Sequence, residues 1–178
     1  MEHEADRSDV AATLAGDADA YRRIVERHQQ AIARRMRRFT ANATAVEELV
    51  QDVFVEAYCS LSNFSGKAPF EHWLNRIATF VGYAFLKRQH KQKKRQNMQL
   101  VLEDQPAAES PNNTEVSESL HHVLDKLSPR DRLVVTLMYL EDRSVAETAI
   151  LTGWSQPMVK VQAFRARAKL RKLMENKR

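Results

Sequence analysis

The sequence predicts an all-α protein made of two small helical domains joined by a flexible acidic linker. Its 178 residues include only four Gly and five Pro and few β-branched runs, a composition that favours helices. Apolar residues recur at helical spacing through much of the chain. The stretch 98–117 differs, because it holds two prolines, acidic and small polar residues, and no Lys or Arg. We therefore expect domains at 8–97 and 118–178, with the linker at 98–117.

The first long helix of the N-terminal domain is predicted from its caps and its apolar stripe. Ser8 and Asp17 are candidate N-caps. The apolar positions after Asp17 follow helical spacing and are Tyr21, Ile24, Val25, His28, Ile32, Met36 and Phe39. The remaining surface is expected to carry four arginines, namely Arg34, Arg35, Arg37 and Arg38.

The next helix is predicted to present an acidic face. Thr44 and Glu47 match a capping box, and apolar residues from Val46 to Leu61 follow the helical template, with Cys59 expected to be a buried thiol. The outer face holds Glu47, Glu48, Gln51, Asp52 and Glu56. In a chain of net charge +5 such a face should repel DNA and suits a basic protein partner, although a merely solvated face is the alternative.

A third helix is predicted to follow the turn-like segment 63–67, with Pro69 in its first turn. Its apolar stripe runs from Phe70 to Phe85, while Phe80 and Tyr83 lie off that stripe. The helix ends in cations that would neutralise phosphates: Lys87, Arg88, Lys91, Lys93, Lys94 and Arg95. Aromatic rings beside cations suit unpaired bases, whereas core aromatics and a solvated helix end are the alternatives.

The C-terminal domain is predicted to contain a helix-turn-helix between Ser144 and Arg171. Ser144 and Glu147 match a capping box, and Gly153 stops that helix before Ser155 caps the next one. The second helix should bury Val159, Ala163, Ala166, Leu170 and Leu173, and should expose Lys160, Val161, Phe164, Arg165 and Lys169. A basic, partly apolar face suits a DNA major groove, although an ordinary helical hairpin has the same local pattern.

The composition argues against several other classes of protein. No apolar run approaches the length of about 20 residues that spans a bilayer, and the acidic, polar N-terminus differs from a signal peptide, so we expect a cytoplasmic protein without membrane insertion. The histidines and the single cysteine form no metal-ligand pattern. Because the chain also lacks a phosphate-binding loop, a nucleophile elbow and a catalytic carboxylate pair, we expect neither an enzyme nor a cofactor or metal.

Taken together, these segments resemble the extracytoplasmic-function (ECF) group of the bacterial sigma-70 family. The stretches GDADAYRRIVERH, VEELVQDVFVEAY and FSGKAPFEHWLNRIA are similar to region 2 of that family. The stretches LDKLSPRDRLVVTLMYLEDRSVAETA and GWSQPMVKVQAFRARAKL are similar to its region 4. The resemblance implies a non-catalytic subunit that binds core RNA polymerase through the β′ clamp and the β flap. It also implies promoter DNA binding, strand opening, and an anti-sigma factor that could hold the protein at the membrane.

The resemblance also implies roles for individual residues. Glu48, Gln51, Asp52 and Glu56 match the helix that contacts the β′ clamp. The surface implied for the minus-10 element comprises Asn63, Ser65, Lys67, Trp73, Arg76, Phe80, Tyr83, Lys87 and Arg88. The surface implied for the minus-35 element comprises Ser155, Gln156, Met158, Lys160, Val161, Phe164 and Arg165. Glu103 and Asp104 of the linker would approach the active-site cleft, where negative charge can mimic RNA.

The chain departs from the family pattern at both DNA-reading surfaces. Phe80 stands where the family usually has Asn, and Ala84 where it usually has Asp. In the recognition helix Met158 replaces a usual Thr, and Val161 and Gln162 replace a more polar pair. Gln156 and Gln162 are the residues whose amides are expected to suit adenine.

Two alternative functions remain compatible with the sequence. A free-standing helix-turn-helix regulator would bind duplex DNA without polymerase, with an affinity that falls steeply with salt. A protein that only sequesters partners through its acidic helix would bind polymerase without supporting transcription.

Overall fold

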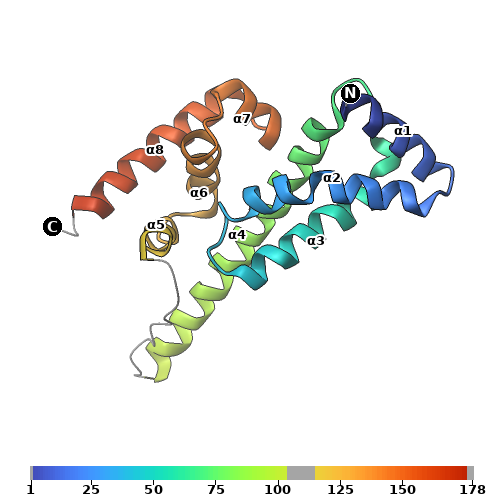
Figure 1. Ribbon diagram of the computed structural model, residues 1–178. Coiled ribbons are helices and arrows are strands. Elements are labelled where there is room, and N and C mark those ends of the chain that lie inside the picture. Colours follow the sequence, from blue (N-terminus) through green and yellow to red (C-terminus); the bar gives the residue numbers. More distant parts are fainter. Residues whose placement is uncertain (1, 104–114, 176–178) are drawn as a thin grey trace. The chain divides into compact units, whose positions relative to one another are not determined.

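The computed structural model describes residues 2–103 and 115–175, which are all-α: this part of the chain holds helices and turns and no β-strand (Figure 1). This confirms the predicted fold class. The chain divides into two compact units, residues 1–82 and 83–178, and the boundary lies inside helix α4 (Phe70–Glu103). Helical structure enters the predicted linker from both sides, because α4 continues to Glu103 and α5 begins at Glu115. The middle of that linker, with Asp104, lies outside the described residues.

The first unit contains α1 (Glu2–Leu14), α2 (Ala18–Met36), α3 (Ala43–Cys59), the 3₁₀ turn η1 (Leu61–Asn63) and the beginning of α4. Asp17 caps α2, as predicted, since its side chain accepts hydrogen bonds from the backbone N–H groups of Asp19 and Ala20. The largest fully buried side chains of this unit are Ile24, Met36, Phe39, Leu49, Val53, Leu61, Phe70 and Leu74. The predicted apolar stripes of the three long helices therefore meet in one core.

Two capping predictions in this unit are wrong. Ser8 lies inside α1, which begins at Glu2, and Thr44 lies inside α3. Asn42 caps α3 instead, because its backbone is extended and its side-chain oxygen accepts from the N–H of Ala45 at 2.9 Å. Cys59 is exposed rather than buried, because it lies off the buried stripe of α3, which consists of Val46, Leu49, Val53, Phe54 and Ala57.

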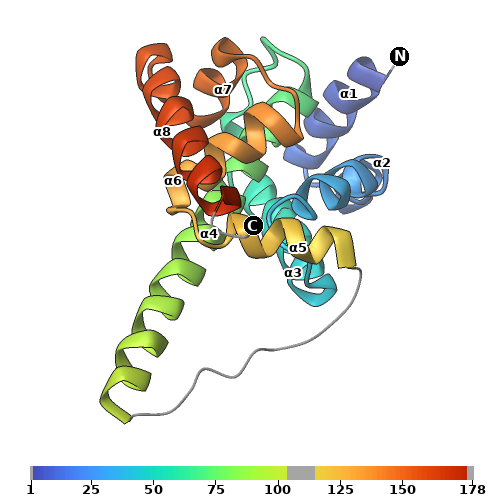
Figure 2. The same ribbon diagram turned by 90° about the vertical axis from the view of Figure 1, so that its left-hand side faces the viewer.

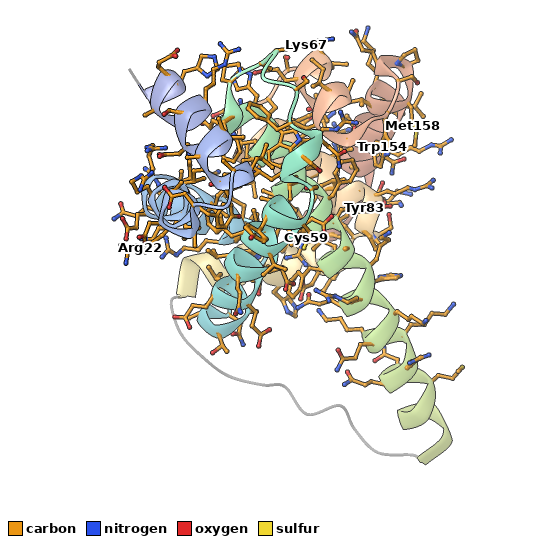
Figure 3. The ribbon with its side chains drawn as sticks, turned by 90° about the vertical axis from the view of Figure 1, so that its right-hand side faces the viewer. Arg22, Cys59, Lys67, Tyr83, Trp154 and Met158 are labelled. Atoms are coloured by element: carbon orange, nitrogen blue, oxygen red, sulfur yellow. The ribbon has the colours of Figure 1, made fainter. Side chains whose placement is uncertain are left out.

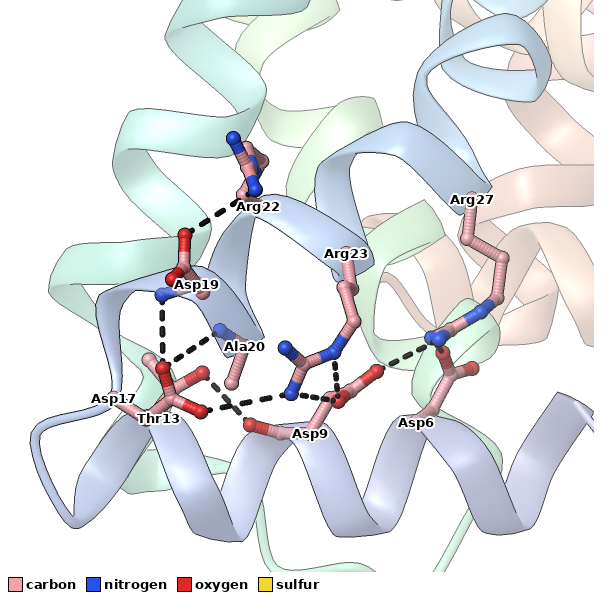
Figure 4. A network of polar contacts seen from close by, with 9 residues as sticks. All are labelled: Asp6, Asp9, Thr13, Asp17, Asp19, Ala20, Arg22, Arg23 and Arg27. Carbon is pink, nitrogen blue, oxygen red and sulfur yellow. Dashed lines mark hydrogen bonds and ion pairs between the residues drawn. The ribbon is translucent and has the colours of Figure 1, made fainter.

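A network of charged side chains fastens α1 to α2 (Figure 4). Asp9 accepts from Arg23 at 2.9 Å and from Arg27 at 2.7 Å, and Asp6 is bonded to Arg27 and to the buried His28. Burial alone would raise the pKa of Asp9, but the hydrogen bonds and charges of Arg27 and Arg23 hold it below its ordinary value. Asp6 and Asp9 thus bind α1 to the arginines of α2.

Arg35, predicted to be a surface arginine, is buried between α2 and α4. Its guanidinium donates to the side-chain oxygen of Asn75 at 2.6 Å and to the hydroxyl of Thr79 at 2.7 Å. Nearby, Gly82 faces the ring of Phe39 so closely that a Cβ would lie 2.6 Å from it. These contacts hold the first turns of α4 in place against α2.

The second unit contains the helix-turn-helix. Its C-terminal part comprises α5 (Glu115–Leu124), α6 (Pro129–Val135), the π-helical turn η2 (Thr136–Leu140), α7 (Val145–Thr152) and α8 (Gln156–Glu175). Its core includes Leu124, Leu133, Val134, Leu137, Val159, Ala163 and Ala166. Figure 2 shows the short connection at residues 153–155 between α7 and α8.

Candidate nucleic-acid and protein interfaces

The turn between α7 and α8 forms as the local sequence predicts. The hydroxyl of Ser144 accepts from the N–H of Glu147, whose carboxylate accepts in return from the N–H of Ser144, so the capping box is complete. The hydrogen bond from the Ser144 side chain lowers the pKa of Glu147. Gly153 adopts the left-handed conformation with φ 73°, and the hydroxyl of Ser155 accepts from the N–H of Met158 at 3.4 Å.

One face of α8 is exposed, as expected for a DNA-reading helix. The buried side consists of Val159, Ala163 and Ala166. Leu170 and Leu173 are partly buried and pack against the core cluster of Leu124, Leu127, Val135 and Ala166. Phe164 is 68% exposed and Val161 50% exposed, and both lie among exposed cations such as Arg165. Ser155, Gln156 and Lys160 are also exposed, whereas Met158 is half-buried.

The amide of Gln162 is bound to another side chain of the protein, which corrects the prediction that it could serve adenine. Its amide nitrogen donates to the side chain of the fully buried Asp131 at 2.5 Å. The sequence could not show this contact, because Asp131 lies 31 residues earlier. Gln156 is the remaining exposed amide of the two that were proposed.

The acidic face of α3 is exposed as predicted and contains apolar residues that the prediction missed. Glu48, Gln51, Asp52 and Glu56 are exposed, and so are Val55 (56%) and Tyr58 (57%). The ring of Tyr58 packs edge-on against that of Tyr21 at 4.9 Å between centroids. The hydroxyl of Tyr21 donates to the backbone oxygen of Phe54, and burial raises its pKa, so it remains protonated. The face thus offers negative charge together with apolar area.

The loop before α4 presents three of the predicted minus-10 residues. Asn63 ends η1 and is exposed, as are Ser65 and Lys67, and Gly66 between them adopts a positive φ of 69°. Figure 3 labels Lys67 on this loop. Trp73 is half-buried, with its ring centroid 5.6 Å from that of Phe64 and 5.4 Å from that of Phe70. The loop is therefore braced by an aromatic cluster.

Helix α4 pairs aromatic rings with cations, as the sequence suggested. The guanidinium of Arg76 lies 5.7 Å from the ring centroid of Phe80, which is 46% exposed. The ammonium of Lys87 lies 4.7 Å from the ring centroid of the half-buried Tyr83. Arg88 is exposed. The two pairs follow one another at helical spacing, so α4 offers stacking surfaces with adjacent positive charge.

An apolar groove that no local sequence pattern indicates lies between α5, η2 and α8. It has a volume of about 660 Å³, and its lining includes Leu120, Val123, Tyr139, Leu140, Leu170 and Met174. Leu120, Tyr139 and Met174 are 44%, 43% and 65% exposed, so the groove is open to a partner. Only the packing of the three elements shows that the position of Leu120 stays uncovered.

Comparison with known proteins now identifies the family. The family model described as Sigma-70 region 2 matches residues 24–92, and the one described as Sigma-70, region 4 matches residues 117–170. The RNA polymerase sigma factor CnrH of Cupriavidus metallidurans is 31% identical over 97% of this chain and 95% of its own length. The chain belongs to the ECF group of the sigma-70 family.

Other ECF sigma factors and one solved structure agree with this assignment. SigM of Mycobacterium tuberculosis is 29% identical over 95% of this chain and 86% of its own length. The sigma-E factor of Escherichia coli is 26% identical over 85% of each chain. A structure of CnrH in complex with the cytosolic domain of CnrY, at 28% identity, matches 97% of this chain and 98% of that one with a TM-score of 0.61.

This sigma factor binds core RNA polymerase and directs promoter recognition and transcription initiation. Its family is not one of enzymes in the usual sense. Within residues 2–103 and 115–175, none of the helices combines the length and the apolar character that a membrane span needs. The same residues contain no group of three or more His, Cys, Asp or Glu side chains placed to hold a metal ion.

Proposed function

We propose that this ECF sigma factor holds core polymerase with α3 and the α5–η2–α8 groove, and holds the promoter with α4 and α8. The observation that carries the proposal is the separation of surface chemistry in a chain of net charge +5: acidic and apolar residues lie together on α3, whereas cations and aromatic rings lie together on α4. Negative charge on α3 would repel DNA and attract a basic protein surface. The protein acts in the cytoplasm, where core polymerase works.

The α3 face binds the clamp of the polymerase β′ subunit. Glu48, Gln51, Asp52 and Glu56 supply the charge that steers association with a basic partner. Val55 and Tyr58 add apolar area that becomes buried on binding, and such area supplies binding energy that exposed ion pairs lack.

The loop 63–67 and α4 bind the minus-10 element as it melts. Phe80 and Tyr83 provide surfaces on which unpaired bases stack. Each stacked base contributes about 1–3 kcal/mol of binding free energy. Stacking of this size offsets the few kcal/mol that it costs to take a base out of the duplex. The residues that contribute are Asn63, Ser65, Lys67, Trp73, Arg76, Phe80, Tyr83, Lys87 and Arg88. Because the side chain of Phe80 has no hydrogen-bonding group, it contacts a base by stacking on it and forms no hydrogen bond to the edge of the base.

The same helix extends its cationic surface toward its C-terminal end. Lys91, Lys94 and Arg95 are exposed and share one face by their spacing, and no Asp or Glu lies between Glu71 and Glu103. We expect these side chains to contact phosphates of the duplex next to the minus-10 element, which would strengthen binding without reading sequence.

Helix α8 reads the minus-35 element in the major groove. Gln156 can serve an adenine, Arg165 a guanine, and the apolar Val161 and Phe164 thymine methyl groups. Ser155, Met158 and Lys160 complete the surface. Replacement of Arg165 by Ala should weaken minus-35-dependent initiation by about 1–3 kcal/mol if it contacts a base, measured by abortive initiation on matched and altered promoters. A loss that is equal on all sequences would identify a phosphate contact instead.

The groove formed by α5, η2 and α8 receives the polymerase β flap. Its exposed Leu120, Tyr139 and Met174 provide the apolar pocket that a partner helix or loop fills with apolar anchors. Docking there places α8 near the DNA only when polymerase is present, which distinguishes a sigma factor from a free-standing regulator.

We further propose that an anti-sigma protein controls this chain. The solved CnrH structure, whose fold matches along 97% of this chain, contains the cytosolic domain of CnrY. A partner of this kind would cover the polymerase-binding surfaces of α3 and of the groove, and would keep the sigma factor from core polymerase.

A transcription experiment tests the proposal against its alternatives. Purified protein is added to core polymerase with a library of promoters, and transcript starts are mapped. We expect new starts downstream of a shared pair of sequence elements. Polymerase binding without new starts would indicate a sequestering protein, and tight, salt-sensitive duplex binding without any effect on polymerase would indicate a free-standing regulator.

A further inference from the structure

We propose that Asp131 is a positioning residue that fixes the rotation of α8, and through it the side chains that meet the minus-35 element. This inference rests on the proposed reading of that element by α8. Asp131 itself lies on α6 and is fully buried, so it cannot contact DNA.

The carboxylate of Asp131 is hydrogen-bonded at both oxygens. Oδ1 accepts from the amide of Gln162 at 2.5 Å, and Oδ2 accepts from the hydroxyl of Ser128 at 2.7 Å and from the ammonium of Lys169. Burial tends to raise the pKa of Asp131, but the hydrogen bonds of Lys169, Ser128 and Gln162 hold it below its ordinary value. One buried anion on α6 therefore binds two side chains of α8.

The two bound side chains lie on the same stripe of α8 as two members of the DNA-reading surface. Met158, Gln162, Arg165 and Lys169 follow one another at intervals of four, three and four residues, which places them along one edge of the helix. Gln162 and Lys169 are held by Asp131, and Met158 and Arg165 alternate with them. Any rotation of α8 that breaks the Asp131 contacts therefore moves Met158 and Arg165 as well.

The apolar packing of α8 is poorly suited to fix this rotation. Two of its three buried residues, Ala163 and Ala166, carry only a methyl group, and apolar contact is not directional. Hydrogen bonds to Asp131 are directional, and the two residues that donate them, Gln162 and Lys169, are attached to α8 about 10 Å apart along its axis, at a rise of about 1.5 Å per residue. A rotation of about 10° would displace a side-chain tip about 6 Å from the axis by about 1 Å, which is enough to break a hydrogen bond to a base.

The test compares base preferences of holoenzymes assembled with variant sigma factors. Asp131→Asn keeps the size of the side chain but places an amide donor where the carboxylate accepts, so at least one α8 contact is lost. Gln162→Ala and Lys169→Gln remove the two contacts from the side of α8. Lys169→Arg keeps the charge, and Lys172→Gln removes an exposed cation from the same helix as a matched control. Transcript starts are counted on a promoter library randomised in the minus-35 element, and thermal unfolding is recorded for each variant.

We expect Asp131→Asn to reduce discrimination between bases by about fivefold or more at one or two minus-35 positions, with the minus-10 preference and core polymerase affinity unchanged. Gln162→Ala and Lys169→Gln should shift the same positions, whereas Lys169→Arg and Lys172→Gln should keep the wild-type profile. Weaker initiation that is uniform across the library would overturn the inference, because it would indicate a purely structural role. If Asp131→Asn fails to fold, the two α8 variants decide in the same way. If the wild-type holoenzyme shows no base preference at any minus-35 position, the proposed function of α8 is refuted instead.

Discussion

Replacement of Lys91, Lys94 and Arg95 by Gln should make promoter binding by the holoenzyme less sensitive to salt. All three side chains are exposed on α4 and share one face, and the helix carries no carboxylate between Glu71 and Glu103 that could pair with them. Lys93 is left unchanged because it is ion-paired with Asp125. A cation that contacts a phosphate releases a condensed counterion, and this release is what makes binding depend on salt.

The expected change follows from the number of side chains removed. Each contact with duplex DNA contributes about 0.9 to the slope of log affinity against log salt, so three contacts contribute about 2.7. Between 50 and 200 mM salt the variant should therefore lose about 40-fold less affinity than the wild type. If the same side chains follow a single strand, the coefficient is about 0.7, the slope change about 2.1 and the difference about 20-fold.

Fluorescence titration of labelled promoter DNA with holoenzyme at several salt concentrations measures these slopes. The charge-conserving variant Lys91→Arg, Lys94→Arg, Arg95→Lys serves as the control and should keep the wild-type slope. An unchanged slope in the Gln variant would refute the assignment of this face to phosphates. A changed slope in the control would show that helix structure, not charge, is responsible.

Three further predictions concern the polymerase surfaces and the first unit. Asp52→Lys should weaken association with core polymerase by about tenfold in a competition assay, because reversal removes an attraction and adds a repulsion. Leu120→Glu should reduce minus-35-dependent initiation, measured by abortive transcription, because a charge in the apolar groove opposes burial by the flap. Asp9→Asn should lower the free energy of unfolding by about 1–3 kcal/mol at pH 7, through weaker hydrogen bonds to the two arginines. Since the folded state holds the pKa of Asp9 below its ordinary 3.8, this stabilisation is complete at neutral pH and is lost as the pH falls below that value.

Matched variants separate these effects from general damage. Glu26→Lys reverses an exposed acid on α2 and should leave polymerase association unchanged. If Glu26→Lys and Asp52→Lys lose the same affinity for core polymerase, Asp52 does not lie in the interface. Leu14→Glu changes a leucine that is 55% exposed on α1, and the same loss there would argue against the groove. Asp19→Asn alters a carboxylate whose side chain is 74% exposed and should change stability little. A difference between Asp9→Asn and wild type that does not shrink as the pH falls below 3.8 would contradict the role of its charge.

Several features of the site could be predicted because they depend on residues within one or two helical turns. The capping box of Ser144 and Glu147, the stop at Gly153 and the exposed face around Phe164 all follow from local spacing. The pairing of Phe80 with Arg76 and of Tyr83 with Lys87 also lies within four residues on α4. Local geometry limits these contacts so strongly that the sequence alone indicates them.

Other features depend on partners that are distant along the chain. Gln162 was expected to face DNA, but it binds Asp131, and Arg35 was expected at the surface, but it binds Asn75 and Thr79, which are 40 and 44 residues away. Helical periodicity cannot predict such partners, because a polar residue at the edge of an apolar stripe can turn toward solvent or toward a buried group.

By itself the sequence determined the helical class, the two regions, and the acidic and cationic surfaces, since composition and periodicity record which faces of each helix are apolar. Tertiary structure alone decided which polar side chains form hydrogen bonds within the protein and where an apolar groove stays open. The groove exists because α5, η2 and α8 leave Leu120, Tyr139 and Met174 uncovered, and Asp131 matters because it is buried between two helices. Both depend on how helices pack, and that packing is set by many contacts at once rather than by any local pattern.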